Sequence, residues 1–96
     1  MKTLFLIYDE DFEAEVNSLV QRDMVIARYT RIDNVVGARM AQIEAETGYA
    51  MDRRNRLIIM VAEDRVIARL ARALQALRRR KKHGLRGFVV PTEVVI

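Results

Sequence analysis

The sequence predicts an α+β domain of the ferredoxin-like kind, in which a β-α-β-β-α-β chain forms a four-stranded antiparallel sheet with two helices on one face. Short runs of β-branched and aromatic residues alternate with two stretches of helical periodicity. The chain has 96 residues, enough for one core, so we expect residues 1–96 to form a single domain. A long connection of about 25 residues separates the second and third predicted strands.

The first strand and helix are predicted from the N-terminal residues. Thr3–Tyr8 is a β-branched and aromatic run typical of a strand. Residues 9–11 are all acidic, and carboxylates suit an N-cap and the positive end of a helix dipole. Apolar residues then recur on one face of a helix that should end near residues 21–23. These residues are Phe12, Val16, Leu19 and Val20.

The next two strands are expected at Met24–Arg31 and Leu57–Ala62. Between them, the insert Ile32–Arg56 is far longer than an antiparallel connection requires, and such length is typical of functional loops. Gly37 and Gly48 are its expected pivots. We therefore interpret this insert as a surface arm that contacts a target protein.

The second helix is predicted from an apolar stripe at spacings of 3, 4 and 3, formed by Ile67, Leu70, Leu74 and Leu77. Glu63 and Asp64 are expected to cap the start of this helix, as residues 9–11 do for the first one. Gly84 can supply a left-handed residue at its end. Phe88–Val90 is the last predicted strand, which Pro91 interrupts.

Two helices can cover only one face of the predicted sheet. Leu57–Ala62 is apolar without interruption and Thr3–Tyr8 nearly so, a pattern of strands covered on both faces. A single copy would leave the second face as a large exposed apolar patch. We therefore expect a homo-oligomer.

A block of positive charge lies at the end of the second predicted helix. Residues 78–87 hold six of the 17 basic side chains, while the other 86 residues carry 11 basic and 13 acidic side chains. Last-turn cations complement the helix dipole, so a solvated helix end is one interpretation. Neighbouring cations also repel one another, and an anion would relieve that repulsion. A nucleotide phosphate, a small anion such as bicarbonate, a nucleic acid or an acidic protein surface would each serve.

Several other function classes find no support in the sequence. It has no cysteine, hence no disulfide framework and no thiolate zinc site. No Ser-His-Asp set, P-loop or dinucleotide fingerprint is present, so we expect no enzyme. The single histidine, His83, lies among cations that would repel a metal ion. No run approaches the roughly 20 apolar residues of a membrane span. The uncharged run Thr3–Tyr8 is too short for a secretory signal, so we expect a cytoplasmic protein.

Four segments carry a resemblance to a known family. They are the start MKTLFLIYDEDFEAEV, residues 36–39 (VGAR), residues 60–64 (MVAED) and the C-terminal GLRGFVVPTEVVI. They resemble the first strand and helix start, the opening of the T-loop, the V-A-D-D strand end and the G-D-G-K-I-F-V-L-P-V-E-E-V-I segment of the PII signalling superfamily, in particular of its small PII-like branch. The family's phosphate loop, T-G-x-x-G-D-G-K, is replaced by RRRKKHGLRG, which keeps one glycine.

The resemblance implies a homotrimer that binds ATP, ADP or AMP, sometimes with a small effector, in clefts between subunits. It also implies that a T-loop, here about residues 32–56, contacts a target such as a transporter or an enzyme. By motif position, Arg86 would contact phosphate, residues 37–39 would line the same cleft, and residues 61–64 would lie near the base. The expected nucleotide- or anion-binding residues are Gly37, Ala38, Arg39, Val61, Ala62, Glu63, Asp64, Arg80, Lys81, Lys82, Gly84, Arg86 and Gly87.

Two alternatives from other classes stay open. Arg86–Val90 resembles the aromatic strand motif of RNA-recognition domains, which would make the chain a small nucleic-acid-binding ferredoxin-like module. Against this, the motif follows the second helix instead of preceding it, and the expected sheet face is mostly aliphatic. A structural oligomer whose basic corner binds an acidic protein is the other alternative.

Overall fold

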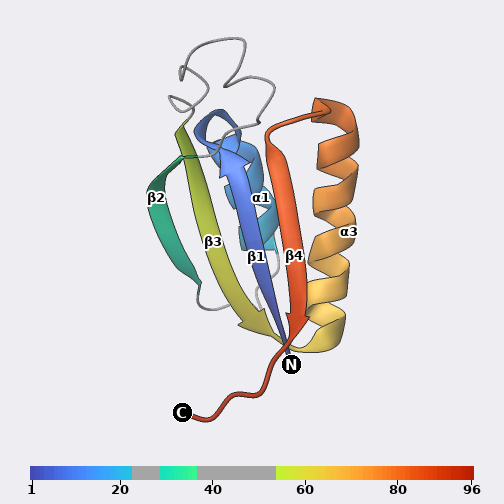
Figure 1. The fold of residues 1–96 in the computed structure, drawn as a ribbon. Coiled ribbons are helices and arrows are strands. Elements are labelled where there is room, and N and C mark those ends of the chain that lie inside the picture. The colour runs from blue at the N-terminus through green and yellow to red at the C-terminus, as the bar shows by residue number, and fades with distance from the viewer. Residues whose placement is uncertain (23–28, 37–53) are drawn as a thin grey trace.

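The computed structural model describes residues 1–22, 29–36 and 54–96, which form one sheet with two helices on one of its faces (Figure 1). The strands pair in the order β2-β3-β1-β4. Strand β1 (Lys2–Asp9) lies between β3 (Arg54–Ala62) and β4 (Leu85–Pro91), and β2 (Thr30–Val36) forms the edge beside β3. All three pairings are antiparallel, which confirms the predicted ferredoxin-like arrangement.

The first helical segment begins where the acidic residues predict it. A short 3₁₀ turn, η1 (Glu10–Phe12), leads into α1 (Glu13–Arg22). The side chain of Asp9 accepts a hydrogen bond from the backbone N–H of Asp11 at 3.0 Å, which satisfies one of the unpaired N–H groups of the helix start. The predicted apolar face of this segment packs against the core, as expected.

The second helix, α3 (Asp64–Lys81), buries the whole predicted stripe and Val66 in addition. Its start differs from the prediction, because the side chain of the N-cap residue Glu63 makes no capping hydrogen bond. The neighbouring carboxylate of Asp64 instead forms an ion pair of 3.1 Å with the amino group of Met1. Glu63 and Asp64 therefore stabilise this helix end through their negative charge, which interacts favourably with the positive end of the helix dipole.

The left-handed residue that ends α3 is Lys82, not Gly84. Lys82 has a φ of 67°, and its N–H donates a hydrogen bond of 2.7 Å to the carbonyl of Arg78. Gly84 also has a positive φ, 77°, but it turns the chain into β4. The chain thus reverses through two left-handed residues instead of the single predicted one. At the far end of β4, Pro91 is the last strand residue, and residues 92–96 form no strand.

The hydrophobic core lies between the sheet and the helices. Tyr8, Val16 and Ile58 have no exposed side-chain surface, and the stripe of α3 closes the core from the other side. Alternate residues of a strand point to opposite faces, so the buried positions of β1 and β3 follow a period of two. The core residues are Leu4, Leu6, Tyr8, Val16, Val20, Ile58, Met60, Ile67, Leu70, Leu74, Leu77 and Leu85.

Strand β2 differs most from its predicted range, Met24–Arg31. It begins at Thr30 and continues to Val36, and residues 23–28 lie outside the described part of the chain. The predicted insert 32–56 is therefore wrong at both ends, because residues 32–36 and 54–56 belong to paired strands. A register shift between Ile32 and Val35 accommodates Asn34, whose φ is 59°, a conformation that asparagine tolerates better than most residues.

The sheet face away from the helices, which we call the open face, is apolar and uncovered in the single copy. The register places Phe5 between Ile59 of β3 and Phe88 of β4. Phe88 is 47% exposed and Ile32 of β2 is 45% exposed. The prediction that the helices cover only one face is confirmed, and Leu57–Ala62 is covered on that face alone. Its residues include Phe5, Ile7, Ile32, Leu57, Ile59, Val61, Phe88 and Val90.

Candidate anion-binding groove

The cationic block at the end of α3 does not form one surface, because successive helix residues point about 100° apart. Arg78 and Arg79 point toward β4 and line a groove there. Arg80 borders a different hollow, on the side of α1. The ammonium group of Lys81 forms an ion pair of 3.2 Å with Glu15 of α1. Only part of the block therefore borders the groove beside β4.

This groove has a volume of about 540 Å³ and lies between α3 and the edge strand β4. It is lined by Gln75, Arg78 and Arg79 of α3 and by Arg86 of β4, which pairs with Ile7 and shares the open face with Phe88. Its floor is apolar and is formed by Leu4, Leu6, Leu74, Leu85 and Val89. Guanidinium groups bind phosphate and carboxylate in a bidentate geometry, while an apolar floor accepts a flat ring. We call it the effector groove.

Two predicted site residues meet at this groove, Arg86 and Gly87. The guanidinium of Arg86 lies 5.6 Å from the ring centroid of Phe88, on the open face, at the strand that borders the groove. Gly87 pairs with Leu6 in the sheet. A Cβ atom at Gly87 would make only ordinary contacts, the nearest at 3.5 Å from the carbonyl of Phe5. The missing side chain thus enlarges the groove and is not demanded by close packing.

Gly84, another predicted anion contact, has a structural role. Its carbonyl accepts a hydrogen bond of 2.8 Å from the N–H of Asp9, which ties the start of β4 to the end of β1. A Cβ atom there would lie 2.6 Å from the ring of Phe12 and 3.3 Å from the Cβ of Asp9. The positive φ and this crowding both select glycine.

Replacing Gly84 with alanine is expected to destabilise the fold. A left-handed alanine costs roughly 1–2 kcal/mol, and the displaced ring of Phe12 adds to this cost. Urea denaturation followed by circular dichroism measures the change. The matched control is Gly87→Ala, which should alter the free energy of unfolding much less because its Cβ has room. Equal stabilities of the two variants would contradict the structural role.

The predicted residues Val61, Ala62, Glu63 and Asp64 lie at the opposite end of the molecule. They form the end of β3 and the start of α3, whereas the effector groove lies toward the end of α3 and the start of β4 (Figure 1). An α-helix of 18 residues, the length of α3, measures about 27 Å. One copy of the chain therefore does not bring these residues together with Arg86.

The remaining predicted contacts, Gly37, Ala38 and Arg39, lie outside the described residues. The strands that flank them are informative. Val36 at the end of β2 pairs with Arg54 at the start of β3. These strand ends lie at the same end of the sheet as the turn from α3 into β4 (Figure 1). Val36 and Arg54, the described residues that flank segment 37–53, thus lie at the end of the sheet where the cationic block is found.

A charge network that the sequence analysis missed connects α1 with β2 and β3. The carboxylate of Glu13 accepts a hydrogen bond of 2.6 Å from the buried hydroxyl of Tyr8. It also pairs with Arg56 at 2.7 Å and with Arg31 at 2.9 Å. Asp33 binds the Nε atoms of Arg31 and Arg56 at 3.1 and 3.4 Å. The sequence offered one signal for this network, namely arginines at strand positions that face a helix. Which acidic side chain each arginine pairs with depends on the sheet register.

The network shifts the pKa of three of its groups, and the hydrogen bond with Glu13 is the main cause that raises the pKa of Arg56. Burial alone would raise the pKa of Glu13, but hydrogen bonds from Tyr8 and Arg56 and the charges of Arg56 and Arg31 outweigh burial and lower the pKa. Burial, together with the hydrogen bond to Glu13 and its charge, raises the pKa of Tyr8. A lowered carboxyl pKa stabilises the fold above the pKa of the unfolded chain, and this stabilisation is lost as the pH falls through the folded value.

Replacing Glu13 with glutamine should therefore remove part of the acid sensitivity of the fold. The wild type should lose stability as the pH falls through the lowered pKa of Glu13, and the variant should show a smaller slope there. At neutral pH the variant should be less stable by about 1 kcal/mol, because the network is partly screened by solvent.

Thermal unfolding between pH 3 and pH 7 measures both effects. Glu15→Gln, on the same helix, is the control, since Glu15 forms only a surface pair with Lys81. An equal pH slope in the Glu13 variant and the wild type would contradict the role of the network.

His83 and the acidic residues form no metal site in the described residues. The ring of His83 lies 6.1 Å from that of Phe12, a tilted aromatic contact. Residues 1–22, 29–36 and 54–96 contain no group of three potential ligands that could hold a metal ion. Within the same ranges, no helix has the length and hydropathy to cross a membrane.

Comparisons with known proteins concern the fold. No family model matches the sequence, and no curated protein is similar to it by sequence. CPII from Thiomonas intermedia K12, solved with ADP, AMP and acetate, superposes with a TM-score of 0.68 at 20% identity, over 92% of this chain and 81% of that one.

Two further solved structures are similar. A DUF3240 family protein from Shewanella baltica has a TM-score of 0.72 at 16% identity, over 98% of this chain and 91% of that one. A PII-like signaling protein from Thermus thermophilus has a TM-score of 0.60 at 18% identity, over 93% of this chain and 83% of that one. The chain therefore has the fold of PII-like proteins, as the resemblance of its sequence segments implied.

Proposed function

We propose that this chain is a cytoplasmic regulatory protein of the PII-like kind and not an enzyme. It forms a homotrimer, binds a small anionic effector and contacts a target protein, such as a transporter or an enzyme, through the segment between β2 and β3, residues 37–53. The observation that carries the proposal is the effector groove, where Arg78, Arg79 and Arg86 border an apolar floor. The PII-like fold gives independent support.

The effector is an adenine nucleotide or bicarbonate. A nucleotide would use both parts of the groove, with the phosphates at Arg78, Arg79 and Arg86 and the base over the apolar floor. Bicarbonate would use the guanidinium groups alone. The CPII structures that contain ADP, AMP and bicarbonate support both candidates.

Assembly of copies would complete the site. Residues 61–64 and Arg86 lie at opposite ends of one copy, so a site that uses both needs a second subunit. The open face supplies the driving force for assembly, because burying Phe88, Ile32 and their neighbours removes apolar surface from water. Trimers whose open faces meet would leave the effector grooves near the contacts between subunits.

The link to the target rests on position. Val36 and Arg54, the described residues that flank segment 37–53, lie at the end of the sheet where α3 passes into β4. An effector bound near that end would favour one arrangement of the segment and thereby change its affinity for the target. The change can be no larger than the effector's own preference between the two arrangements.

Calorimetric titration of the full chain with ATP, ADP, AMP and bicarbonate tests the proposal. At least one should bind, and Arg86→Ala should weaken that binding roughly tenfold or more, because a charge-assisted hydrogen bond is lost. Arg72→Ala is the control, since Arg72 is an exposed residue of α3 that does not line the groove. An effector bound equally well by all three proteins would place its site elsewhere, and no binding by any would refute the function.

A nucleic-acid-binding module is the second candidate. Phe5 and Phe88 are paired neighbours on the open face, as stacking aromatics of RNA-binding sheets would be. The facing residues of β3, Leu57, Ile59 and Val61, are aliphatic and weigh against it. Steep salt dependence of poly(U) binding with no response to nucleotides would favour this candidate.

A further inference from the structure

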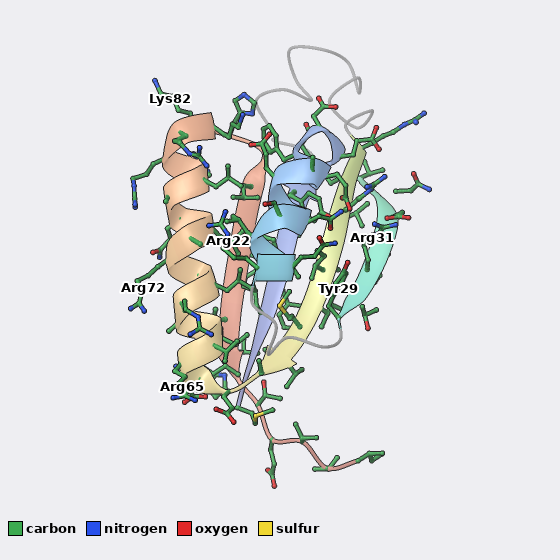
Figure 2. All side chains as sticks on the ribbon, turned by 180° about the vertical axis from the view of Figure 1, so that it is seen from behind. Arg22, Tyr29, Arg31, Arg65, Arg72 and Lys82 are labelled. Carbon is green, nitrogen blue, oxygen red and sulfur yellow. The ribbon has the colours of Figure 1, made fainter. Side chains whose placement is uncertain are left out.

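A second concave surface, which we call the helix furrow, runs between α1 and α3 on the side of the fold away from the open face (Figure 2). It consists of two hollows of about 340 and 260 Å³. Both are lined by Leu19 and Arg22 of α1, so they adjoin. Arg22 lies between the two helices in the view from behind (Figure 2).

The helix furrow is positively charged. Arg22 borders both hollows, Arg69 borders one and Arg80 the other. Glu15 lines the second hollow, but its carboxylate is already paired with Lys81 at 3.2 Å. Among residues 1–22, 29–36 and 54–96, no carboxylate forms an ion pair with Arg22 or Arg80. Within these ranges, Arg22 and Arg80 thus present guanidinium groups to the furrow that no carboxylate pairs with.

The floor of the helix furrow is apolar and has the spacing of a helix ridge. Leu70, Ala73 and Leu77 follow one another on α3 at intervals of three and four residues, and Leu19 faces them from α1. Ala73 is the small residue of this row, and its short side chain leaves room for a side chain from outside. Helices pack by placing the side-chain ridge of one into such a row on another.

These features select one kind of partner. Among the residues that the structure describes, no aromatic side chain lines either hollow, so nucleic acid bases would find no stacking surface there. The apolar residues lie at the bottom of the furrow, below a rim of guanidinium groups. A flat lipid surface would therefore contact the rim but not the apolar floor. An amphipathic helix fits both the apolar floor and the charged rim, because its apolar side chains can lie on the floor while its carboxylates bind Arg22 and Arg80.

We propose that the helix furrow binds an acidic amphipathic helix of a partner protein. Among the described residues, the furrow shares no lining residue with the effector groove, so this interaction does not depend on effector binding. It also lies away from the open face, so it stays accessible when open faces pack together. The partner helix carries apolar residues every three to four positions, flanked by glutamates or aspartates.

The test is an NMR titration of the ¹⁵N-labelled full chain with a synthetic helical peptide of about 14 residues that has this pattern. The amide signals of Ser18, Leu19 and Ala73 should shift. Arg80→Glu should weaken binding about tenfold, since it reverses the charge at the rim. Arg72→Glu makes the same change on the same helix outside the furrow lining and should weaken binding no more than about twofold.

A second variant separates shape from charge. Ala73→Leu fills the hollow without changing charge and should abolish binding of the peptide. Equal loss in Arg80→Glu and Arg72→Glu would overturn the proposal, because the attraction would then be diffuse. Equal affinity for a peptide with serines in place of its leucines would overturn it as well. The proposal would also be overturned if poly(U) or phosphatidylserine vesicles bound in a way that depends on the furrow residues while the peptide did not bind.

Arg86→Ala distinguishes this proposal from the function proposed above. It should leave peptide affinity unchanged while it weakens effector binding, since Arg86 lies at the other groove. Loss of peptide affinity in this variant would contradict the independence of the two surfaces.

Discussion

Phe88→Glu is expected to separate the proposed homo-oligomer into folded single chains. Phe88 is 47% exposed in one copy and lies on the open face opposite Phe5. Assembly through the open face would bury this position, and an unpaired carboxylate there costs several kcal/mol. The association constant should therefore fall by at least about a hundredfold. The single chain should stay folded, because the substitution leaves the core residues on the other face of the sheet unchanged.

Sedimentation velocity at micromolar concentration measures this change, and circular dichroism reports the fold. Ala76→Glu is the matched control, since it adds the same charge at an exposed position of α3 away from the open face. That variant should sediment like the wild type. A wild-type protein that sediments as a folded single chain would refute the trimer and any site completed between subunits.

Gly87→Val is expected to abolish effector binding while it preserves the fold. The position lines the effector groove, and a Cβ there meets nothing closer than 3.5 Å. Valine is favoured in strands, so the free energy of unfolding should stay the same or rise by up to about 1 kcal/mol. Its branched side chain would occupy the space above Leu6 and exclude a ligand.

The series glycine, alanine, valine at position 87 provides the graded control. Calorimetric affinity should fall stepwise along it, by more than about tenfold for valine. Urea denaturation and sedimentation of the same samples separate loss of the groove from loss of the fold or the oligomer. Undiminished affinity in the valine variant would mean that the effector does not occupy this groove.

Local patterns in the sequence correctly predicted most of the fold. The spacing of Ile67, Leu70, Leu74 and Leu77 identified the buried face of α3, since a helix buries one stripe whatever it packs against. The uninterrupted apolar strand 57–62 indicated a second face that the helices leave uncovered. The boundaries of β2 were missed, because its pairing with the long strand β3 extends it beyond the residues with the strongest strand propensity.

The candidate site was only partly predictable. Arg86 and Gly87 were expected, and they lie at the effector groove. Arg78 and Arg79 line the groove, while Arg80 borders the helix furrow. Which of several consecutive cations faces a groove depends on the rotation of the helix against the sheet, and a run of like residues carries no information about it.

The amino-acid order alone determined the alternation of strands and helices, the buried stripes and the concentration of charge near the end of α3, since these depend on neighbours within a few positions. The tertiary structure alone decided that this charge divides between two grooves, that Glu13 gathers Arg31 and Arg56, and that residues 61–64 lie far from Arg86. These arrangements join residues distant in the chain, and their geometry follows from sheet register and helix packing.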